Sequence, residues 1–169
     1  MGAGGLFLRR LRATVSEQPT GFVWVEEGRL AGSGFPASRS QLEWLSRRGV
    51  RTILTLTENP LPTRWLEGLG FDVRHVPMSD HLPPDGASLE EAAVFVQESV
   101  SGGRTTLVHC LAGQGRTGCV LAAYLVKTKG LSGGEAIRVL REIKPQFVER
   151  GQERTVLDFG RTANTRSDS

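Results

Sequence analysis

The sequence predicts an α/β fold in which helices flank a central, mainly parallel sheet of about five strands. Short runs of apolar and β-branched residues alternate with amphipathic segments of helical spacing along most of the chain. Such alternation is typical of parallel strands joined by helical crossovers. The 169 residues, of which 38% are hydrophobic and 23% charged, suffice for one globular domain with a sizeable core.

Residues 1–20 have a composition of their own. Apolar residues are interspersed with arginines there, and the first acidic residue is Glu17. Mitochondrial presequences have a similar composition, but the shortness of the stretch favours a peripheral N-terminal arm. We therefore expect an arm at 1–20, the domain at 21–161 and a flexible tail at 162–169.

The first half of the domain contains four predicted strands and two predicted helices. Ser38 and Gln41 have the spacing of a capping box, which marks the start of the first helix. In order, we expect strands at 22–25 and 29–32, a helix at 38–48, a strand at 50–57, a short helix at 65–69 and a strand at 71–76.

The second half continues this alternation after a proline-bearing loop at 77–87. Ser88 with Glu91, and Ser132 with Glu135, have capping-box spacing, so a helix is expected to begin at each serine. In order, we expect a helix at 88–100, a strand at 105–108 and helices at 117–129, 132–143 and 147–159.

The ten residues from His109 to Gly118 join a buried strand to a buried helix. Gly113 and Gly115 let the backbone bend tightly and approach a ligand closely. The N–H groups of a loop that leads into a helix form a cradle for an anion. Arg116 adds a planar, permanently charged group that fits two phosphate oxygens.

Cys110 opens this loop, so its sulfur is expected at the base of the cradle. Positive potential there stabilises the thiolate over the thiol. A thiolate beneath a bound phosphate is a nucleophile in line with phosphorus. The alternative is a structural cysteine in a glycine-rich turn. A Walker-type phosphate loop is excluded, because the Gly-Lys-Ser/Thr ending is absent.

Transfer of a phosphoryl group to Cys110 would release an alkoxide or phenoxide, which needs a proton donor. Ligands of such sheets lie beyond the carboxyl ends of the strands, so the loops at 58–62 and 77–87 can reach the site. The second loop offers two candidate acids, Asp80 and Asp85. The alternative for each is a solvated aspartate of a turn.

The loop resembles the signature of the cysteine-based protein tyrosine phosphatases. The matching residues are His109, Cys110, Gly113, Arg116, Thr117 and Gly118. From Trp24 to Phe159 the chain is similar to the small atypical dual-specificity phosphatases and their archaeal tyrosine-phosphatase relatives. The resemblance implies their fold. It also implies that the chain hydrolyses phosphotyrosine through a cysteinyl phosphate, without a metal ion. The same chemistry extends to phosphoserine and phosphothreonine.

The resemblance also implies roles outside the loop. The general acid of small dual-specificity phosphatases lies about thirty residues before the cysteine, and 110 − 80 is 30 whereas 110 − 85 is 25. This favours Asp80, although His81 stands where an aromatic residue is often found. Gln152 is similar to a glutamine that positions the hydrolytic water, with a solvated helix glutamine as the alternative. Glu58 is implied in recognition of the phosphorylated residue.

The other residues of the loop have supporting roles. His109 is expected to hold the loop by hydrogen bonds, and no residue at zinc-ligand spacing to it suggests a metal. Thr117 would either donate a hydrogen bond to the Cys110 sulfur or cap the following helix. The backbone that binds phosphate is expected to be that of Leu111, Ala112, Gly113, Gln114, Gly115 and Arg116.

Two other functions use the same loop. A lipid or RNA phosphatase is one, but Leu111 and Gln114 stand where related inositol-phosphate enzymes carry lysines, which favours a substrate with one phosphate. A non-catalytic phosphate-binding module is the other, and the presence of Cys110, Arg116 and Asp80 together argues against it.

Cys119 could form a protective disulfide with Cys110, but a packing role is the favoured interpretation.

Composition limits the partners. The net charge of +3 suits an anionic substrate, and it is too small and dispersed to indicate nucleic acid. No apolar run reaches the length of a membrane span, so no membrane partner is expected. Two cysteines make no disulfide framework, which favours the cytoplasm. We expect a monomer without cofactor that acts on a phosphorylated protein or a small aryl phosphate.

Overall fold

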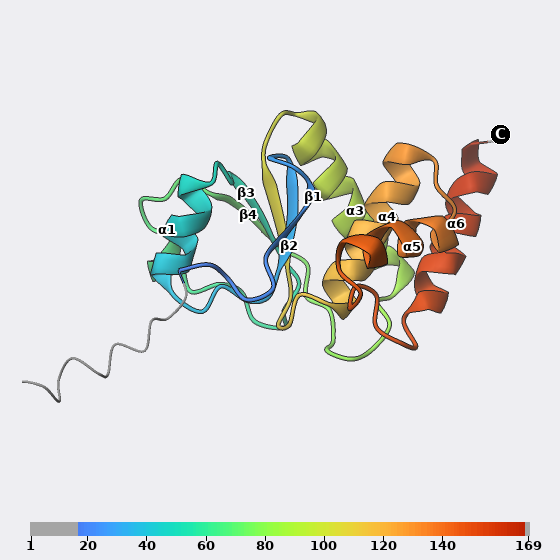
Figure 1. The fold of residues 1–169 in the computed structure, drawn as a ribbon, viewed down its shortest axis with the longest axis horizontal. Helices are drawn as coiled ribbons and strands as arrows, with labels where there is room; N and C mark the ends of the chain where they lie inside the picture. The colour runs from blue at the N-terminus through green and yellow to red at the C-terminus, as the bar shows by residue number, and fades with distance from the viewer. Residues whose placement is uncertain (1–16, 168–169) are drawn as a thin grey trace, which may run out of the picture.

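The computed structural model describes residues 17–167, with side chains up to residue 163 (Figure 1). Its strands are β1 (Val23–Glu26), β2 (Leu30–Ser33), β3 (Thr52–Thr55), β4 (Asp72–His75) and β5 (Thr106–His109). Its helices are α1 (Arg39–Arg47), α2 (Thr63–Leu66), α3 (Gly86–Ser101), α4 (Gly115–Lys129), α5 (Gly133–Ile143) and α6 (Glu153–Ser167).

The strands form one five-stranded sheet in the order β1-β2-β5-β3-β4. β1 pairs with β2 in antiparallel orientation, and the other three pairings are parallel. The predicted mainly parallel α/β fold is therefore confirmed. In the register of β3 and β5, Thr55 lies opposite His109, so the loops after these two strands begin side by side.

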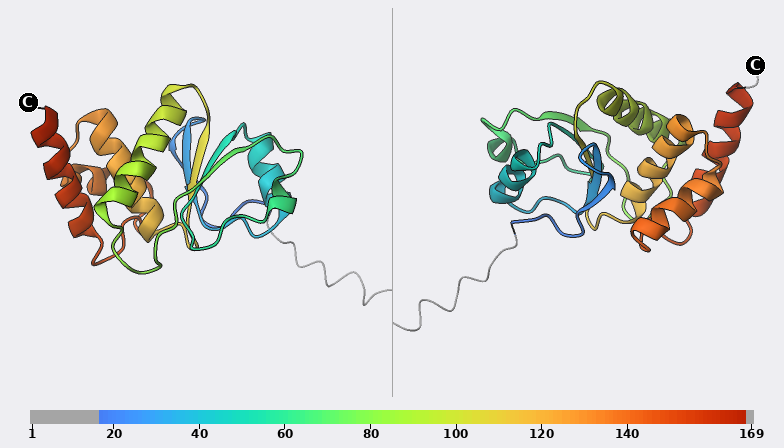
Figure 2. Two further views of the ribbon diagram at one scale, coloured as in Figure 1. Left: turned by 180° about the vertical axis from the view of Figure 1, so that it is seen from behind. Right: turned by 45° about the horizontal axis from the view of Figure 1, so that its top comes forward.

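Helices cover both faces of the sheet. α1 and α2 lie on one face, and α3, α4, α5 and α6 lie on the other (Figures 1 and 2). Each face has its own hydrophobic cluster: Leu42 and Leu45 of α1 belong to one, and Val120 and Leu121 of α4 to the other. α4 is buried from Gly115 to Val126, which explains why its sequence is apolar on all sides.

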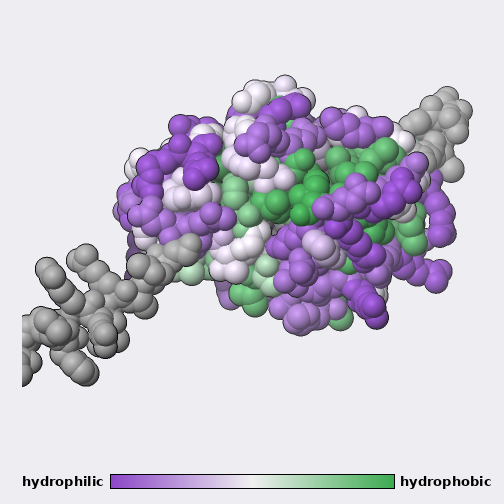
Figure 3. All heavy atoms as spheres, in the orientation of Figure 1, coloured by the Kyte–Doolittle hydropathy of each residue, from purple (hydrophilic) through white to green (hydrophobic). Residues whose placement is uncertain are grey.

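One face of the molecule is largely hydrophilic, as Figure 3 shows, and it has a hydrophobic area near its middle over β1 and the helices beside it. Val23 and Val25 of β1 are only partly buried and pack against the larger cluster. No helix in the described part of the chain is long and apolar enough to cross a bilayer.

Two of the helices begin at their predicted caps. Ser38 caps α1, and Ser132 with Glu135 forms a complete capping box at α5. The predicted box of Ser88 and Glu91 is wrong, because α3 begins earlier. Its N-cap is Asp85, whose carboxylate accepts hydrogen bonds from the backbone N–H and the hydroxyl of Ser88 at 2.9 and 2.7 Å.

The last predicted helix differs in both boundaries. Residues 147–152 form turns, in which Val148 has a φ of 60° and donates its N–H to the carbonyl of Gln114 at 3.3 Å. This tertiary bond replaces a helical one. α6 then runs to Ser167, so residues 162–167 continue the helix and are not the separate tail that we expected. The expectation for residues 1–16 lies outside the described residues.

Candidate active site

The loop between β5 and α4 lies at the carboxyl edge of the sheet, beside the loops that follow β3 and β4. This loop, the loop after β4 and the turns before α6 line a cavity of about 230 Å³. Its lining includes Asp80, Cys110, Arg116, Glu149 and Gln152. The topology therefore assembles residues from three separate segments at the predicted edge.

Gly113 gives the loop its shape. It has a φ of +68°, and a Cβ there would lie 2.3 Å from the carbonyl carbon of Ser33, so no other residue fits without a shift of backbone. Its N–H points to Cys110 Sγ at 3.3 Å. Within the described chain the N–H groups of Leu111, Ala112 and Gln114 have no hydrogen-bond partner. These free donors are what an anion cradle requires.

Cys110 lies at the base of this loop and is 2% exposed. It lines the cavity, so its sulfur is enclosed by protein yet adjacent to the space that a ligand would occupy. It is not in a disulfide. Its sulfur accepts the backbone hydrogen bond from Gly113 and lies near the start of α4.

Arg116 is 2% exposed and is held from three sides. Its Nη1 donates to the carbonyl of Met78 at 3.0 Å and to Glu58 Oε2 at 3.2 Å. Its Nη2 lies 2.8 Å from Asp80 Oδ1. Nε has no partner in the described part of the chain. The guanidinium is thus oriented by protein groups while one N–H edge is left for an anion.

Asp80, and not Asp85, reaches the cavity. Besides its ion pair with Arg116, the Asp80 carboxylate accepts the N–H of His81 at 3.0 Å. His81 has a φ of 57°, and its ring lies 3.5 Å from Asp80 and 3.6 Å from Glu149. Asp85 is the N-cap of α3 and bonds to Ser88. Asp80 therefore lines the same cavity as Cys110 and pairs with Arg116, and its role as general acid stays a prediction.

Glu58 braces the other two charged groups. Its Oε1 accepts the N–H of Asp80 at 2.8 Å, and its Oε2 accepts from Arg116. Hydrogen bonds from its own backbone N–H and that of Asp80 lower the pKa of the Glu58 carboxyl, and Arg116 adds to this. Sequence reasoning missed this bracing role. Recognition of substrate by Glu58 stays a prediction.

His109 is buried at the end of β5, and each of its ring nitrogens has a hydrogen-bond partner. It is fully buried, its Nε2 lies 2.9 Å from Thr55 Oγ1, and its Nδ1 lies 3.4 Å from the carbonyl of Cys110. A carbonyl only accepts, so Nδ1 carries the proton and Nε2 accepts from Thr55. Burial lowers the pKa of His109 to about 4, against the opposing effect of the bond to Cys110.

Neither predicted contact of Thr117 is present. Its Oγ1 is buried without a hydrogen-bond partner in the described structure, and the donor to Cys110 Sγ is the N–H of Gly113. Thr117 is also not the N-cap of α4, which is Gln114. The helix begins two residues earlier than predicted, so Thr117 lies inside its first turn. An unpaired buried hydroxyl costs roughly 1–3 kcal/mol. The Thr117 hydroxyl is thus a hydrogen-bond donor that no group of the described structure uses.

Gln152 lies in the turn before α6 and is 2% exposed. Its Nε2 donates to the carbonyl of Leu82 at 3.1 Å, and its Oε1 accepts from Cys119 Sγ at 3.7 Å. Gln152 is therefore a buried residue that lines the cavity and not a solvated helix residue. It also ties the loop that holds Asp80 to the segment before α6. Burial raises the pKa of the Cys119 thiol to about 12.

A family model described as Swiss Army Knife protein, DSP-PTPase phosphatase domain (PTP-SAK), matches residues 19–157. The chain belongs to this dual-specificity phosphatase family. The match covers every strand and all of the cavity residues described above.

Relatives of known name agree with this assignment. Dual specificity protein phosphatase Mpk3 of Drosophila melanogaster is 35% identical over 104 residues, which cover 61% of this chain and 25% of the relative. Human dual specificity protein phosphatase 9 is 34% identical over 134 residues, covering 76% and 34%. The chain thus spans a quarter to a third of the length of these two relatives.

Two further comparisons cover more of the related chains. The phosphatidylglycerophosphate phosphatase PTPMT2 of Arabidopsis thaliana is 30% identical over 137 residues, covering 78% of this chain and 60% of the relative. The crystal structure of Tk-PTP in the active form superposes with a TM-score of 0.74 at 30% identity, covering 86% of this chain and 97% of that one. The predicted resemblance and its fold are confirmed.

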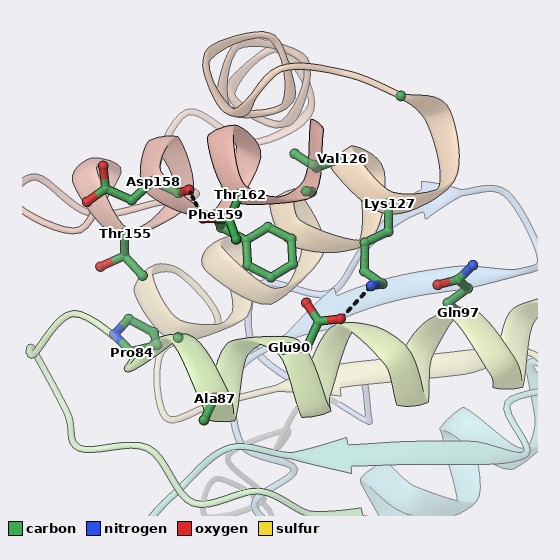
Figure 4. Close-up of a pocket in the computed structure, with 13 residues that line it drawn as sticks. Pro84, Ala87, Glu90, Gln97, Val126, Lys127, Thr155, Asp158, Phe159 and Thr162 are labelled. Atoms are coloured by element: carbon green, nitrogen blue, oxygen red, sulfur yellow. Dashed lines mark hydrogen bonds and ion pairs between the residues drawn. The ribbon is translucent and has the colours of Figure 1, made fainter. Parts of the chain in front are cut away.

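A larger cavity of about 800 Å³ lies elsewhere in this dual-specificity phosphatase domain, between α3, α4 and α6 (Figure 4). Phe159 points into it, and an ion pair of 2.6 Å joins Lys127 to Glu90 along its side. It contains neither cysteine nor Arg116. The chemistry of the smaller cavity, and not size, identifies the candidate site. Among the described residues, no three of His, Cys, Asp and Glu cluster as metal ligands would.

Proposed function

We propose that this domain hydrolyses phosphate monoesters of proteins, with phosphotyrosine as the principal substrate, through a phosphate bonded to Cys110. One observation carries the proposal: a buried thiol and a buried guanidinium from one loop and a carboxylate from another line one cavity. The wall of that cavity includes backbone N–H groups without a hydrogen-bond partner among the described residues. A phosphate dianion satisfies those donors and the free edge of Arg116 together.

In the first step the Cys110 thiolate attacks phosphorus, and the bond from phosphorus to the leaving oxygen breaks. Asp80 in its protonated form gives its proton to that oxygen, so an alcohol or a phenol departs. To do so, Asp80 must exchange its contact with Arg116 for one with the leaving group. The phosphate oxygens that replace it on Arg116 carry the charge of the transition state.

In the second step water attacks the cysteinyl phosphate. The Asp80 carboxylate takes a proton from that water, the phosphorus–sulfur bond breaks, and thiolate and inorganic phosphate are released. Gln152 lies in the cavity wall, where its amide can orient the water. Donation by Thr117 to the departing thiolate is part of the proposal, and the unpartnered hydroxyl of Thr117 in the described structure supports it. No step requires a metal ion.

The charge of the lining supports a substrate with one phosphate. Arg116 is the only arginine or lysine among the cavity residues of the described chain, and Asp80 and Glu149 oppose further negative charge. The test is a panel of tyrosine, serine and threonine phosphopeptides, with and without EDTA. We expect release of phosphate from phosphotyrosine peptides at an unchanged rate in EDTA. Loss of activity in EDTA contradicts the proposal.

A lipid phosphate monoester is the second candidate, and a specific observation favours it. Leu111 in the cavity wall and Leu82 in the loop that follows Asp80 are exposed by 60% and 59%. Exposed leucines beside a phosphate site can contact acyl chains or a membrane surface. The relative PTPMT2 is a phosphatidylglycerophosphate phosphatase. Vesicles that contain this lipid, assayed beside the phosphopeptides, separate the two substrates by kcat/KM.

We also infer a reducing compartment such as the cytoplasm, because Cys110 and Cys119 are free thiols and one of them is the proposed nucleophile. A monomer is the proposed state, since the cavity is assembled from one chain. Light scattering of the purified full chain in reducing buffer, with and without phosphate, tests that state. A dimer stable at micromolar concentration contradicts it.

A further inference from the structure

Lys144 contacts the phosphate-binding loop from outside the cavity. It is the C-cap of α5, and its side chain is partly buried. Its Nζ donates to the carbonyl of Gly113 at 2.7 Å and to the carbonyl of Gly21 at 3.2 Å. The ammonium also lies 5.2 Å from the centre of the Phe147 ring. Nζ is therefore fixed against the loop by three contacts.

The bond to Gly113 determines which way a peptide unit faces. In a planar trans peptide the carbonyl of one residue and the N–H of the next point in opposite directions. Since the carbonyl of Gly113 points to Lys144, the N–H of Gln114 points away from Lys144. That N–H has no partner in the described protein, which is the condition for a donor to bound phosphate.

Glycine makes this peptide unit easy to rotate. Gly113 has a φ of +68° and no Cβ, so its own conformational preference does little to prevent a flip of the following peptide. A flipped unit would present a carbonyl oxygen to the phosphate and remove one donor from the cradle. Something outside the loop must hold the unit in place, and Lys144 is the side chain that bonds to its oxygen.

Lys144 is separated from the substrate. Burial lowers the pKa of its ammonium group. Lys144 does not line the cavity, so it acts on the loop without touching the substrate.

We propose that Lys144 is a positioning residue for phosphoryl transfer, which holds the Gly113–Gln114 peptide in its phosphate-binding orientation. This inference rests on the proposed function. Lys144→Met removes both the donor and the charge with little change in volume. Lys144→Gln keeps a neutral donor, and Lys144→Arg keeps both donor and charge. Lys127→Met is the matched control, a half-buried lysine that is paired with Glu90 far from the loop.

Two measurements separate positioning from mere stability. The first is the protection of Cys110 from iodoacetamide by inorganic phosphate, and the second is competitive inhibition by inorganic phosphate and vanadate. For Lys144→Met we expect the oxyanion affinity in both measurements to fall by about tenfold. Lys144→Gln, which keeps a donor, should retain part of the affinity. Lys144→Arg and Lys127→Met should match the parent.

Parental phosphate protection and oxyanion inhibition in a folded Lys144→Met variant overturn the inference, as does an equal effect of Lys127→Met. If Lys144→Met does not fold, the comparison of Lys144→Gln with Lys144→Arg decides by the same two readouts. Failure of the proposed function is distinguishable, because the parent itself would then lack phosphatase activity. A parent that is active beside an unaffected Lys144→Met variant removes this inference alone.

Discussion

At the scale of single residues, Arg116 shows how much of the site depends on contacts that a motif does not describe. The motif specifies a guanidinium six residues after the thiol. The structure adds that Glu58 and the carbonyl of Met78 fix its Nη1, and that Asp80 occupies its Nη2. These contacts orient the group before any phosphate arrives. They also mean that substrate binding and release of Asp80 from Arg116 are coupled.

The general acid is the residue whose assignment can be tested most selectively. Asp80→Asn should lose kcat on the order of 100-fold on phosphotyrosine peptides, and much less on an ester of an activated phenol, because a good leaving group needs no proton. The alkaline limb of the kcat–pH profile should flatten. Asp85→Asn is the matched control, since asparagine caps a helix as well as aspartate does. A flattened limb in the Asp85 variant alone would reverse the assignment.

His109 predicts a dependence of stability on pH. Its pKa is about 4 in the folded domain and about 6.5 when exposed. The unfolded chain thus binds a proton between these values when the folded chain does not. The stabilisation is complete above about pH 6.5 and is lost as pH falls toward 4, by about 3 kcal/mol in total. Urea unfolding of the parent and of His109→Asn across this range measures it, and parallel curves would contradict it.

The candidate site residues could be predicted from the sequence where their roles depend on neighbours along the chain. Cys110, Arg116 and the loop glycines are read from a contiguous stretch, and the choice of Asp80 over Asp85 depends on the spacing that the family resemblance implies. Contacts made across the fold were not predictable. The contact of Lys144 with Gly113 joins residues 31 positions apart, and the absent bond of Thr117 depends on where α4 begins.

At the scale of elements, two glycines allow α5 and α6 to pack closely. A Cβ at Gly133 would lie 2.5 Å from the carbonyl oxygen of Val156, and one at Gly160 would lie 2.6 Å from the Gly133 nitrogen. Both contacts are with backbone, which cannot move aside as a flexible side chain can. The crossing carries the segment with Gln152 to the cavity, because that segment joins the two helices.

Gly160→Ala should therefore separate the two helices and lower the free energy of unfolding by about 1–3 kcal/mol. Gly134→Ala is the control, since the nearest atom to a Cβ added at this position is a side-chain carbon of Leu157 at 3.8 Å. That change should be neutral or stabilise by up to about 1 kcal/mol, as alanine favours helix. Equal unfolding free energies for the two variants, measured in urea, would show that the crossing tolerates a methyl group.

Element positions were largely predictable because their periodicity is local. All five strands and the first five helices lie where the pattern places them, within a few residues at their ends. The errors occur where a tertiary contact replaces a local one. Asp85 takes the cap that was assigned to Ser88, and Val148 bonds to Gln114 in place of extending a helix.

At the scale of the whole molecule, strand order assembles the site. β5 lies in the middle of the sheet, between β2 and β3, so the loop after it is flanked by the ends of both neighbours. The sequence predicts a parallel sheet, yet several strand orders satisfy the same alternation of elements. The observed order depends on how two hydrophobic clusters fill both faces, which no local pattern specifies. The edge of the sheet that holds the site was predictable from the sequence. Which loops meet at that edge was only partly predictable.

The central claim is that a phosphoryl group passes through Cys110, and trapping that group tests it most directly. The parent is mixed with a phosphotyrosine peptide, quenched in acid within the first turnover and digested for mass spectrometry. We predict one phosphate on the peptide that contains Cys110, and none in Cys110→Ser, which should still bind vanadate. Full turnover by Cys110→Ser, or a phosphate on any other residue, would contradict the account.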